Sequence, residues 1–107
     1  MDAVEPTREQ LRLSAVLEAL ASPQRLEVVV RLTQEPAVLA CGELIPEVAK
    51  STRSHHLRML RDSGVMRLNR DGRYLRPSLR RDDLDARFPG LLDAILANAG
   101  EPRAATA

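Results

Sequence analysis

Basic side chains that could bind a phosphate backbone are concentrated between Lys50 and Arg81. This segment holds ten basic residues and only two acidic ones, which gives it a charge of +8. The rest of the chain carries −7, so the net charge of +1 hides the asymmetry. Such an uneven distribution is typical of a protein that binds a polyanion with one face. The alternative is an arginine-rich face that is merely solvated. The ten basic residues are Lys50, Arg53, Arg58, Arg61, Arg67, Arg70, Arg73, Arg76, Arg80 and Arg81.

Few other residues have the types and spacing that chemistry needs. The single cysteine is Cys41, and the two histidines, His55 and His56, are adjacent. Neighbouring residues of a helix point about 100° apart, so this pair does not chelate one ion together. We expect one histidine to pack and the other to face a ligand. With no nucleophile–base pair and no glycine-rich phosphate loop, the sequence predicts neither an enzyme nor a cofactor.

Hydrophobic periodicity predicts helices on both sides of the basic segment. A first helix is expected from Arg8 to about Ala21, and a second from Pro23 to about Leu32 with Ser22 as its N-cap. Two more are expected at 80–87 and from Pro89 to about Ala97. The apolar stripe of the first helix is Leu13, Val16, Leu17 and Leu20. In the second helix, Leu26, Val29 and Val30 are expected to face inward. The apolar stripe of the last helix is Leu91, Leu92, Ile95 and Leu96.

The basic segment itself is predicted to form a helix followed by a hairpin. Lys50–Asp62 has helical periodicity, and Gly64 is placed to end it at the C′ position. Val65–Leu79 changes to strand character around Asp71-Gly72, which indicates a hairpin with a type I′ turn. Before this helix, 37–40 is expected as a strand or buried linker and 42–47 as a brief helix.

The phase of the Lys50–Asp62 helix selects the side chains that could contact a nucleic acid. With Leu57 and Leu60 facing inward, Ser51, His55 and Arg58 face outward. Such side chains can reach base edges and phosphates in a major groove. The candidates on the helix are Lys50, Ser51, Thr52, Ser54, His55 and Arg58, and those on the hairpin are Arg67, Arg70 and Arg73. Arg53 falls on the inward side, and the cap that Ala49 cannot supply is expected from Ser51.

The order of these elements is that of a winged helix-turn-helix, and two stretches resemble the ArsR/SmtB family of repressors. SHHLRMLRDSGVMRLNRDGRY, which begins at Ser54, resembles the family's S-x-H-L-x-x-L-R-x-x-G signature and the charged hairpin after it. LASPQRLEVV, which begins at Leu20, resembles its L-x-x-P-x-R-L opening. The expected fold is therefore mainly α with a small β-hairpin, in one domain over residues 7–99. Residues 1–6 and 100–107 are expected to be tails.

The resemblance implies a homodimer that represses transcription from a short inverted repeat, paired through its first and last helices. The predicted interface residues are Leu13, Val16, Leu17, Leu91, Leu92 and Ile95. A dimer would also enlarge the core of a chain this small. Without a membrane-spanning run or a secretory signal, we expect a cytoplasmic protein. The alternative function is a winged-helix module that binds proteins, or a nucleoid protein that binds DNA without sequence preference.

Metal-sensing relatives in this family use a Cys-x-Cys pair close to where Cys41 lies. A soft-metal site needs several such ligands, and this chain has one cysteine, so no metal is expected. A carboxylate site shared across a dimer remains open, with Asp82, Asp83, Asp85 and Asp93 as its candidates. Cys41 is a possible sensor thiol, because a helix N-terminus can lower a thiol pKa. The alternative is a small buried residue beside Gly42.

Overall fold

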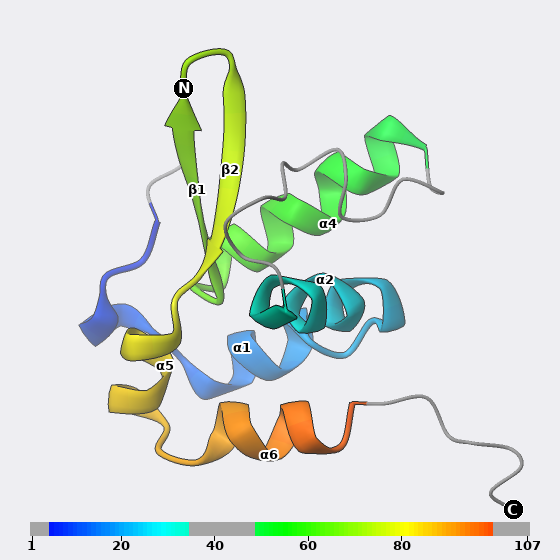
Figure 1. Ribbon diagram of the computed structural model, residues 1–107. Helices are drawn as coiled ribbons and strands as arrows, with labels where there is room; N and C mark the ends of the chain where they lie inside the picture. The colour runs from blue at the N-terminus through cyan, green and yellow to red at the C-terminus, as the bar shows by residue number, and fades with distance from the viewer. Residues whose placement is uncertain (1–4, 35–48, 100–107) are drawn as a thin grey trace, which may run out of the picture.

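The computed structural model describes residues 5–34 and 49–99 of the 107-residue chain (Figure 1). Its elements are η1 (Arg8–Gln10), α1 (Leu13–Ala19), α2 (Pro23–Gln34), α4 (Lys50–Asp62), β1 (Met66–Asp71), β2 (Tyr74–Leu79), α5 (Arg81–Arg87) and α6 (Leu91–Ala97). In Figure 1, α4 and the β1–β2 hairpin lie on one side of α1 and α2, and α6 lies on the other. The segments predicted at 37–40 and 42–47 fall outside the described residues.

The single helix predicted from Arg8 to Ala21 is wrong, because the chain is extended at Leu11 and Arg12 between η1 and α1. The extended backbone places Leu11 in the core, where it is 1% exposed. Arg87 compensates for the interrupted helix by donating to the carbonyls of Arg8 and Leu11, at 3.1 and 2.6 Å. A tertiary contact has therefore replaced helical hydrogen bonds that local pattern alone would favour.

This break changes which apolar side chains of α1 are buried. Val16 and Ala19 are in the core, whereas Leu13 and Leu17 are 46% and 44% exposed. The next helix, α2, begins as predicted, with the backbone N–H of Arg25 donating to Ser22 Oγ at 3.3 Å. It ends two residues later than predicted. Its buried side chains are Val28, Val29 and Leu32, while Leu26 and Val30 are only half-buried.

Helix α4 has the predicted bounds and ends in a Schellman motif. The N–H of Gly64 donates to the carbonyl of Arg61 at 3.0 Å, and that of Val65 to Leu60 at 3.1 Å. Gly64 has φ +88°, and a Cβ there would lie 2.1 Å from Leu11 Cδ2. Glycine is needed at this position for its backbone conformation and for the close approach of Leu11. The chain then turns directly into β1.

The hairpin is present, but its predicted turn is shifted by one residue. Asp71 pairs with Tyr74 in the antiparallel register, so the two-residue loop is Gly72-Arg73 rather than Asp71-Gly72. In the described residues only glycines have positive φ, and Gly72 has φ +65°. Positive φ at the first loop position alone is the pattern of a type II′ turn, so the predicted type I′ turn is wrong.

The core is aliphatic apart from one methionine, and it joins α4 and the hairpin to the helices around them. Leu57 and Leu60 of α4 are buried with Val65 and Met66 at the start of β1. The remaining buried apolar residues are Leu11, Val16, Ala19, Leu20, Val28, Val29, Leu32, Leu84 and Leu92. Since a core of this kind is nondirectional, polar contacts must contribute to the orientation of the hairpin.

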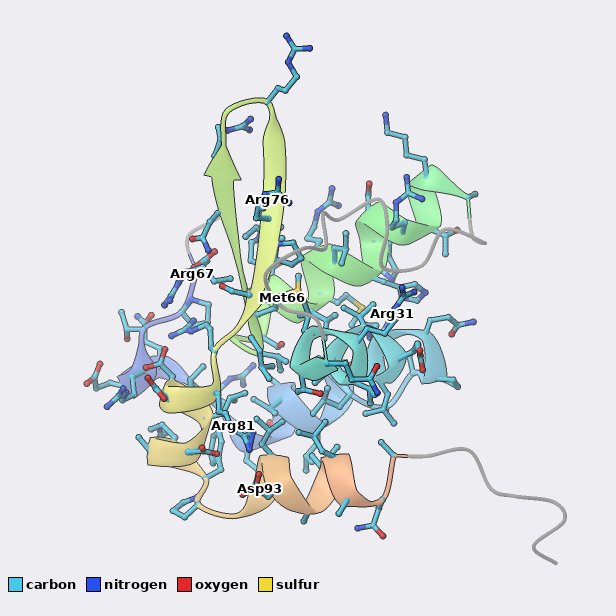
Figure 2. All side chains as sticks on the ribbon, viewed as in Figure 1. Arg31, Met66, Arg67, Arg76, Arg81 and Asp93 are labelled. Atoms are coloured by element: carbon cyan, nitrogen blue, oxygen red, sulfur yellow. The ribbon has the colours of Figure 1, made fainter. Side chains whose placement is uncertain are left out.

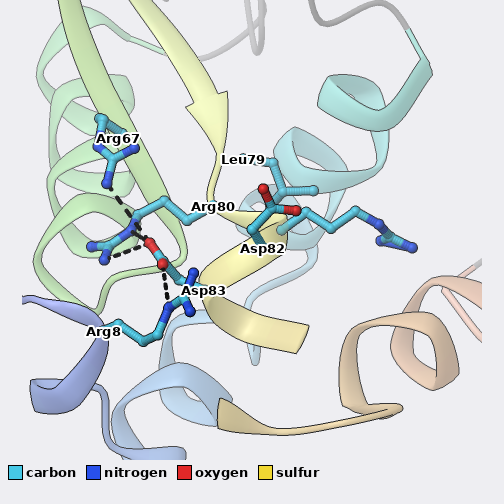
Figure 3. Close-up of a pocket in the computed structure, with 7 residues that line it drawn as sticks. Arg8, Arg67, Leu79, Arg80, Asp82 and Asp83 are labelled. Atoms are coloured by element: carbon cyan, nitrogen blue, oxygen red, sulfur yellow. Dashed lines mark hydrogen bonds and ion pairs between the residues drawn. The ribbon is translucent and has the colours of Figure 1, made fainter. Parts of the chain in front are cut away.

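The carboxylate of Asp83 forms ion pairs with three arginines at the base of the hairpin (Figure 3). The side chain of Arg80 is 2% exposed, and its Nε and Nη2 both lie 2.8 Å from Asp83 Oδ2. Arg8 Nε donates to Asp83 Oδ1 at 2.8 Å, and Arg67 Nη2 lies 3.7 Å from Oδ2. We call these four residues the Asp83 cluster. The hydrogen bond from Arg8, followed by the contact with Arg80, lowers the pKa of Asp83.

Residues 5 and 6, expected in the N-terminal tail, pack against this region. The carbonyl of Pro6 accepts a hydrogen bond from Arg80 Nη1 at 2.6 Å. The carboxylate of Glu5 accepts hydrogen bonds from the N–H of Leu68 at 3.2 Å and from Arg67 Nε at 3.3 Å. The Asp83 cluster therefore joins the N-terminal segment, β1 and α5.

We expect Gly64→Ala to destabilise the protein more than Gly90→Ala. Both glycines have positive φ, which costs an alanine about 1 kcal/mol, but a Cβ at Gly90 meets nothing within 4 Å. The clash with Leu11 should raise the cost of Gly64→Ala to about 2 kcal/mol or more. Urea unfolding of both variants measures the difference. Equal costs would mean that Leu11 moves aside freely.

We expect Asp83→Asn to lower the free energy of unfolding by about 2 to 3 kcal/mol, because Arg80 would be buried without its counter-charge. Asp82→Asn, which removes an exposed carboxylate from the neighbouring position, is the matched control. Folding lowers the pKa of Asp83. Its contribution to the free energy of unfolding is therefore complete above the ordinary pKa of an aspartate, about 3.9, and is lost as pH falls through the pKa of Asp83 in the folded protein. Unfolding measured against pH should show the variant and the wild type converging in acid. If the difference in unfolding free energy between the wild type and Asp83→Asn stayed constant into acid, Asp83 would not be the charged partner of Arg80.

Candidate DNA-binding surface

One face of α4 presents polar side chains to solvent while the opposite face is in the core. Leu57 and Leu60 are buried, which confirms the predicted phase of the helix. The six α4 residues predicted to contact DNA are all exposed: Lys50, Ser51, Thr52, Ser54, His55 and Arg58. Arg53, predicted to face inward, is half-exposed. The burial pattern gives α4 one free polar face, and contact of that face with DNA stays a prediction.

The first turn of α4 adds backbone donors to this face. The N-cap is Ala49, and no side chain in the described residues caps it, so the predicted shift of the cap to Ser51 is wrong. The first N–H groups of a helix have no intrahelical partner, and the helix dipole favours an anion beside them. A phosphate could therefore be held by backbone N–H groups near Lys50, a contribution that side-chain patterns in the sequence did not reveal.

The adjacent histidines of α4 have different environments, as expected. His55 is exposed, whereas His56 is 9% exposed and lies against α2. Arg25 Nη1 is 3.2 Å from His56 Nδ1, and the same guanidinium donates to the carbonyls of Ala19 and Glu18, at 2.7 and 3.3 Å. Burial, and then the charge of Arg25, lowers the pKa of His56. Sequence reasoning missed Arg25, although it belongs to the LASPQRLEVV stretch.

The predicted hairpin arginines are divided between the tip and the base. Arg70 and Arg73 are exposed towards the tip. Arg67 lies near the base, where Glu5 and Asp83 bind it (Figure 2). The antiparallel register places Arg67 and Arg76 on one face of the hairpin and Arg70 on the other. The tip arginines are therefore better placed to contact a partner than Arg67.

Together, α4 and the hairpin tip project from the same side of the molecule (Figure 1). A helix with an exposed polar face fits the width of a major groove, and a hairpin beside it can reach the adjacent backbone or minor groove. The two elements that sequence analysis placed in the +8 segment are thus brought to one surface. Their chemistry and geometry suit a DNA duplex.

The residues predicted for a dimer interface fall into two groups. Val16 and Leu92 are 1% and 2% exposed and are part of the chain's own core, so they do not offer a surface to a partner. Leu13 and Leu17 are exposed, and Leu91 and Ile95 are half-buried. These four remain candidates for an interface formed by α1 and α6.

The aspartates considered as metal ligands are mostly engaged by arginines. Asp83 belongs to the Asp83 cluster, and Asp85 and Asp93 are both paired with Arg81 (Figure 2). Within residues 5–34 and 49–99, no group of three or more potential ligands could hold a metal ion. Cys41 lies outside the described residues. In the same ranges no helix is both long and apolar enough to cross a bilayer.

Comparison with known proteins identifies transcriptional regulators among the relatives of this chain. No family model matches the sequence. The chain is 30% identical over 89 residues to the uncharacterized HTH-type transcriptional regulator YceK of Bacillus subtilis (strain 168), covering 81% of this chain and 88% of that protein. The crystal structure of the transcriptional repressor BigR from Xylella fastidiosa has a TM-score of 0.61 and 22% identity, over 84% and 88% of the two chains, and it supports the fold alone.

A second crystal structure, that of the ArsR family transcriptional regulator RHA00566, agrees in sequence as well as fold. It has a TM-score of 0.62 and 31% identity, over 79% of this chain and 88% of that one. The exposed polar face of α4 and the hairpin beside it are the features that such a winged-helix regulator requires. The chain therefore belongs to the ArsR family of DNA-binding transcriptional regulators.

Proposed function

We propose that this chain is a cytoplasmic homodimeric repressor that binds a short inverted repeat, with α4 in the major groove and the hairpin tip on the adjacent backbone or minor groove. The observation that carries the proposal is the free polar face of α4, opposite a face held in the core by Leu57 and Leu60. BigR, whose fold this chain shares, is described as a transcriptional repressor, and this supports repression rather than activation.

The composition of the α4 face supports recognition of sequence rather than of charge alone. His55 and Arg58 can form hydrogen bonds with base edges, and the hydroxyl groups of Ser51, Thr52 and Ser54 can bind either bases or phosphates. A protein that bound DNA without sequence preference would need only positive charge. Basic side chains at the hairpin tip, Arg70 and Arg73, would then supply affinity more than discrimination.

A dimer is supported by the apolar side chains that the chain leaves outside its core. Leu13 and Leu17 on α1 are nearly half exposed, although Leu is favoured inside. A twofold interface that covered them would give two copies of α4 with opposite orientation. Two such helices can read half-sites about one helical turn apart, roughly 34 Å, which matches an inverted repeat.

We expect Arg58→Ala and Arg73→Ala to affect DNA binding differently. Both remove one exposed arginine, so their effects on net charge are matched. Arg58→Ala should lose about 1 to 3 kcal/mol of discrimination at particular base pairs. Arg73→Ala should weaken binding to every duplex by a similar factor and reduce the dependence of affinity on salt.

The measurement is a binding profile for each variant over a randomised duplex library at one salt concentration. A duplex selected by the wild type and a random duplex then give the specificity ratio. Equal wild-type affinity for these two duplexes would refute the sequence-specific function and favour nucleoid binding. An unchanged base preference in Arg58→Ala would mean that α4 does not read bases through this residue.

For the dimer, we expect Leu17→Glu to shift the protein to a monomer, because a charge would be buried in the proposed interface. Gln24→Glu adds a charge at an exposed position of α2 and serves as the control. Sedimentation equilibrium measures the dissociation constant of each. A dimer of unchanged stability in Leu17→Glu, with the fold intact by circular dichroism, would place the interface elsewhere.

A further inference from the structure

The contact between Arg25 and His56 is a polar link between α4 and the helical body that direct DNA recognition does not require. It joins three elements, because Arg25 of α2 also holds the carbonyls of Glu18 and Ala19 at the end of α1. A partly buried hydrogen-bonded pair such as this one restricts orientation in a way that aliphatic packing does not. The Arg25–His56 contact is therefore placed to influence the angle at which α4 leaves the body.

The geometry of this contact determines the protonation state of His56. A guanidinium has only donors and does not lose its proton, so Arg25 Nη1 must donate to His56 Nδ1 across the 3.2 Å separation. Nδ1 can accept only when it carries no proton, which requires a neutral ring with its hydrogen on Nε2. A doubly protonated ring would place an N–H and a second positive charge against Arg25.

We propose that Arg25 and His56 are positioning residues for α4, and that protonation of His56 breaks their contact and weakens DNA binding in mild acid. The inference rests on the proposed function in one respect, that α4 is the helix that reads DNA. Neither residue needs to touch DNA for this effect. His56 acts through the orientation of α4, and Arg25 acts through His56.

The charged groups around His56 support this assignment. Arg25 faces it from α2, and His55 of the same helix has its ring centroid 5.8 Å away. From α1 come the two backbone carbonyls that hold Arg25. Among the described residues, no carboxylate is among the groups that shift its pKa, and β1 contributes none of these groups. The two carbonyls are already bound by Arg25, and no group in this set carries a negative charge that would stabilise an imidazolium.

The direction of the pH effect follows from the lowered pKa of His56. The unfolded chain binds a proton near the ordinary histidine value, about 6.5, while the folded chain resists it. The Arg25–His56 contact therefore contributes fully to the stability of the folded chain above that value. This contribution is lost as pH falls through the pKa of His56 in the folded protein.

The test uses the full chain in a His55→Gln background, so that His56 is its only histidine. The probe is one duplex selected from a random library by the His55→Gln protein itself, because His55 lies on the face proposed to read bases. Fluorescence anisotropy gives its affinity from about pH 7.5 to about pH 5.5, the range in which histidine titrates. Each protein is normalised to its own value at the upper pH. The comparison protein adds His56→Gln, whose amide oxygen can accept from Arg25 but does not titrate.

We expect the affinity of the His55→Gln protein to fall on the order of tenfold over this range, and that of the double variant to stay nearly flat. Equal profiles for the two proteins would overturn the inference. A second measurement is the NMR titration of the His56 ring in the wild type and in Arg25→Met. The wild-type ring should titrate below its ordinary value and move back towards it in Arg25→Met. An ordinary value in the wild type would also overturn the inference.

Failure of the proposed function has a different signature. If α4 does not read DNA, Arg58→Ala leaves the base preference unchanged, and acid does not alter affinity through His56. The backbone amide signals of α4 would still shift as the His56 ring titrates, because the contact with Arg25 is intramolecular. Unshifted α4 signals, with DNA binding still weakened in acid, would instead show that His56 does not act by positioning the helix.

Discussion

The buried guanidinium of Arg80 is the constraint on which the arrangement of the hairpin depends. A charge that is 2% exposed is stable only with a partner charge and hydrogen bonds around it. Asp83 provides the charge, and the carbonyl of Pro6 accepts a further hydrogen bond. These contacts require the N-terminal segment, the end of β2 and the start of α5 to meet at one point. The hairpin is thereby fixed at its base, and its tip extends freely into solvent (Figure 1).

Helix α4 is attached to the body by a different combination of forces. Leu57 and Leu60 supply apolar burial, and the Arg25–His56 contact supplies direction. The two elements proposed to contact DNA are thus each oriented by a partly or fully buried arginine, but with partners of different acidity. The pKa of the Asp83 carboxylate is lowered from an ordinary value near 3.9, and that of the His56 imidazole from one near 6.5, so His56 gains its proton in milder acid than Asp83 does. Acid can therefore affect the position of α4 while the base of the hairpin remains intact.

Positive charge in the segment from Lys50 to Arg81 serves two purposes that the sequence does not separate. Arg67, Arg80 and Arg81 are bound by acidic residues of the chain itself. Arg58, Arg70 and Arg73 are exposed on α4 and near the hairpin tip. The charge left available to a polyanion is consequently smaller than the segment total, and its exposed part lies where the two elements project. Intramolecular pairing thus leaves Arg58, Arg70 and Arg73 as exposed basic side chains on α4 and near the hairpin tip.

Sequence alone determined the features that depend on short stretches of chain. The bounds of α4, the glycine that ends it, the phase of its polar face and the presence of the hairpin all follow from local periodicity and backbone preference. Tertiary structure decided where helices break, which apolar side chains are buried and which distant residues pair, because these depend on which segments pack together. The break at Leu11 and Arg12 exists because Leu11 fills the space at Gly64 and Arg87 binds the freed carbonyls. It left Leu13 and Leu17 exposed, whereas contact with the body buried Val16 and Leu92. The pairing of Arg25 with His56, 31 residues apart, has no local signal, because only the packing of α2 against α4 brings the two side chains together.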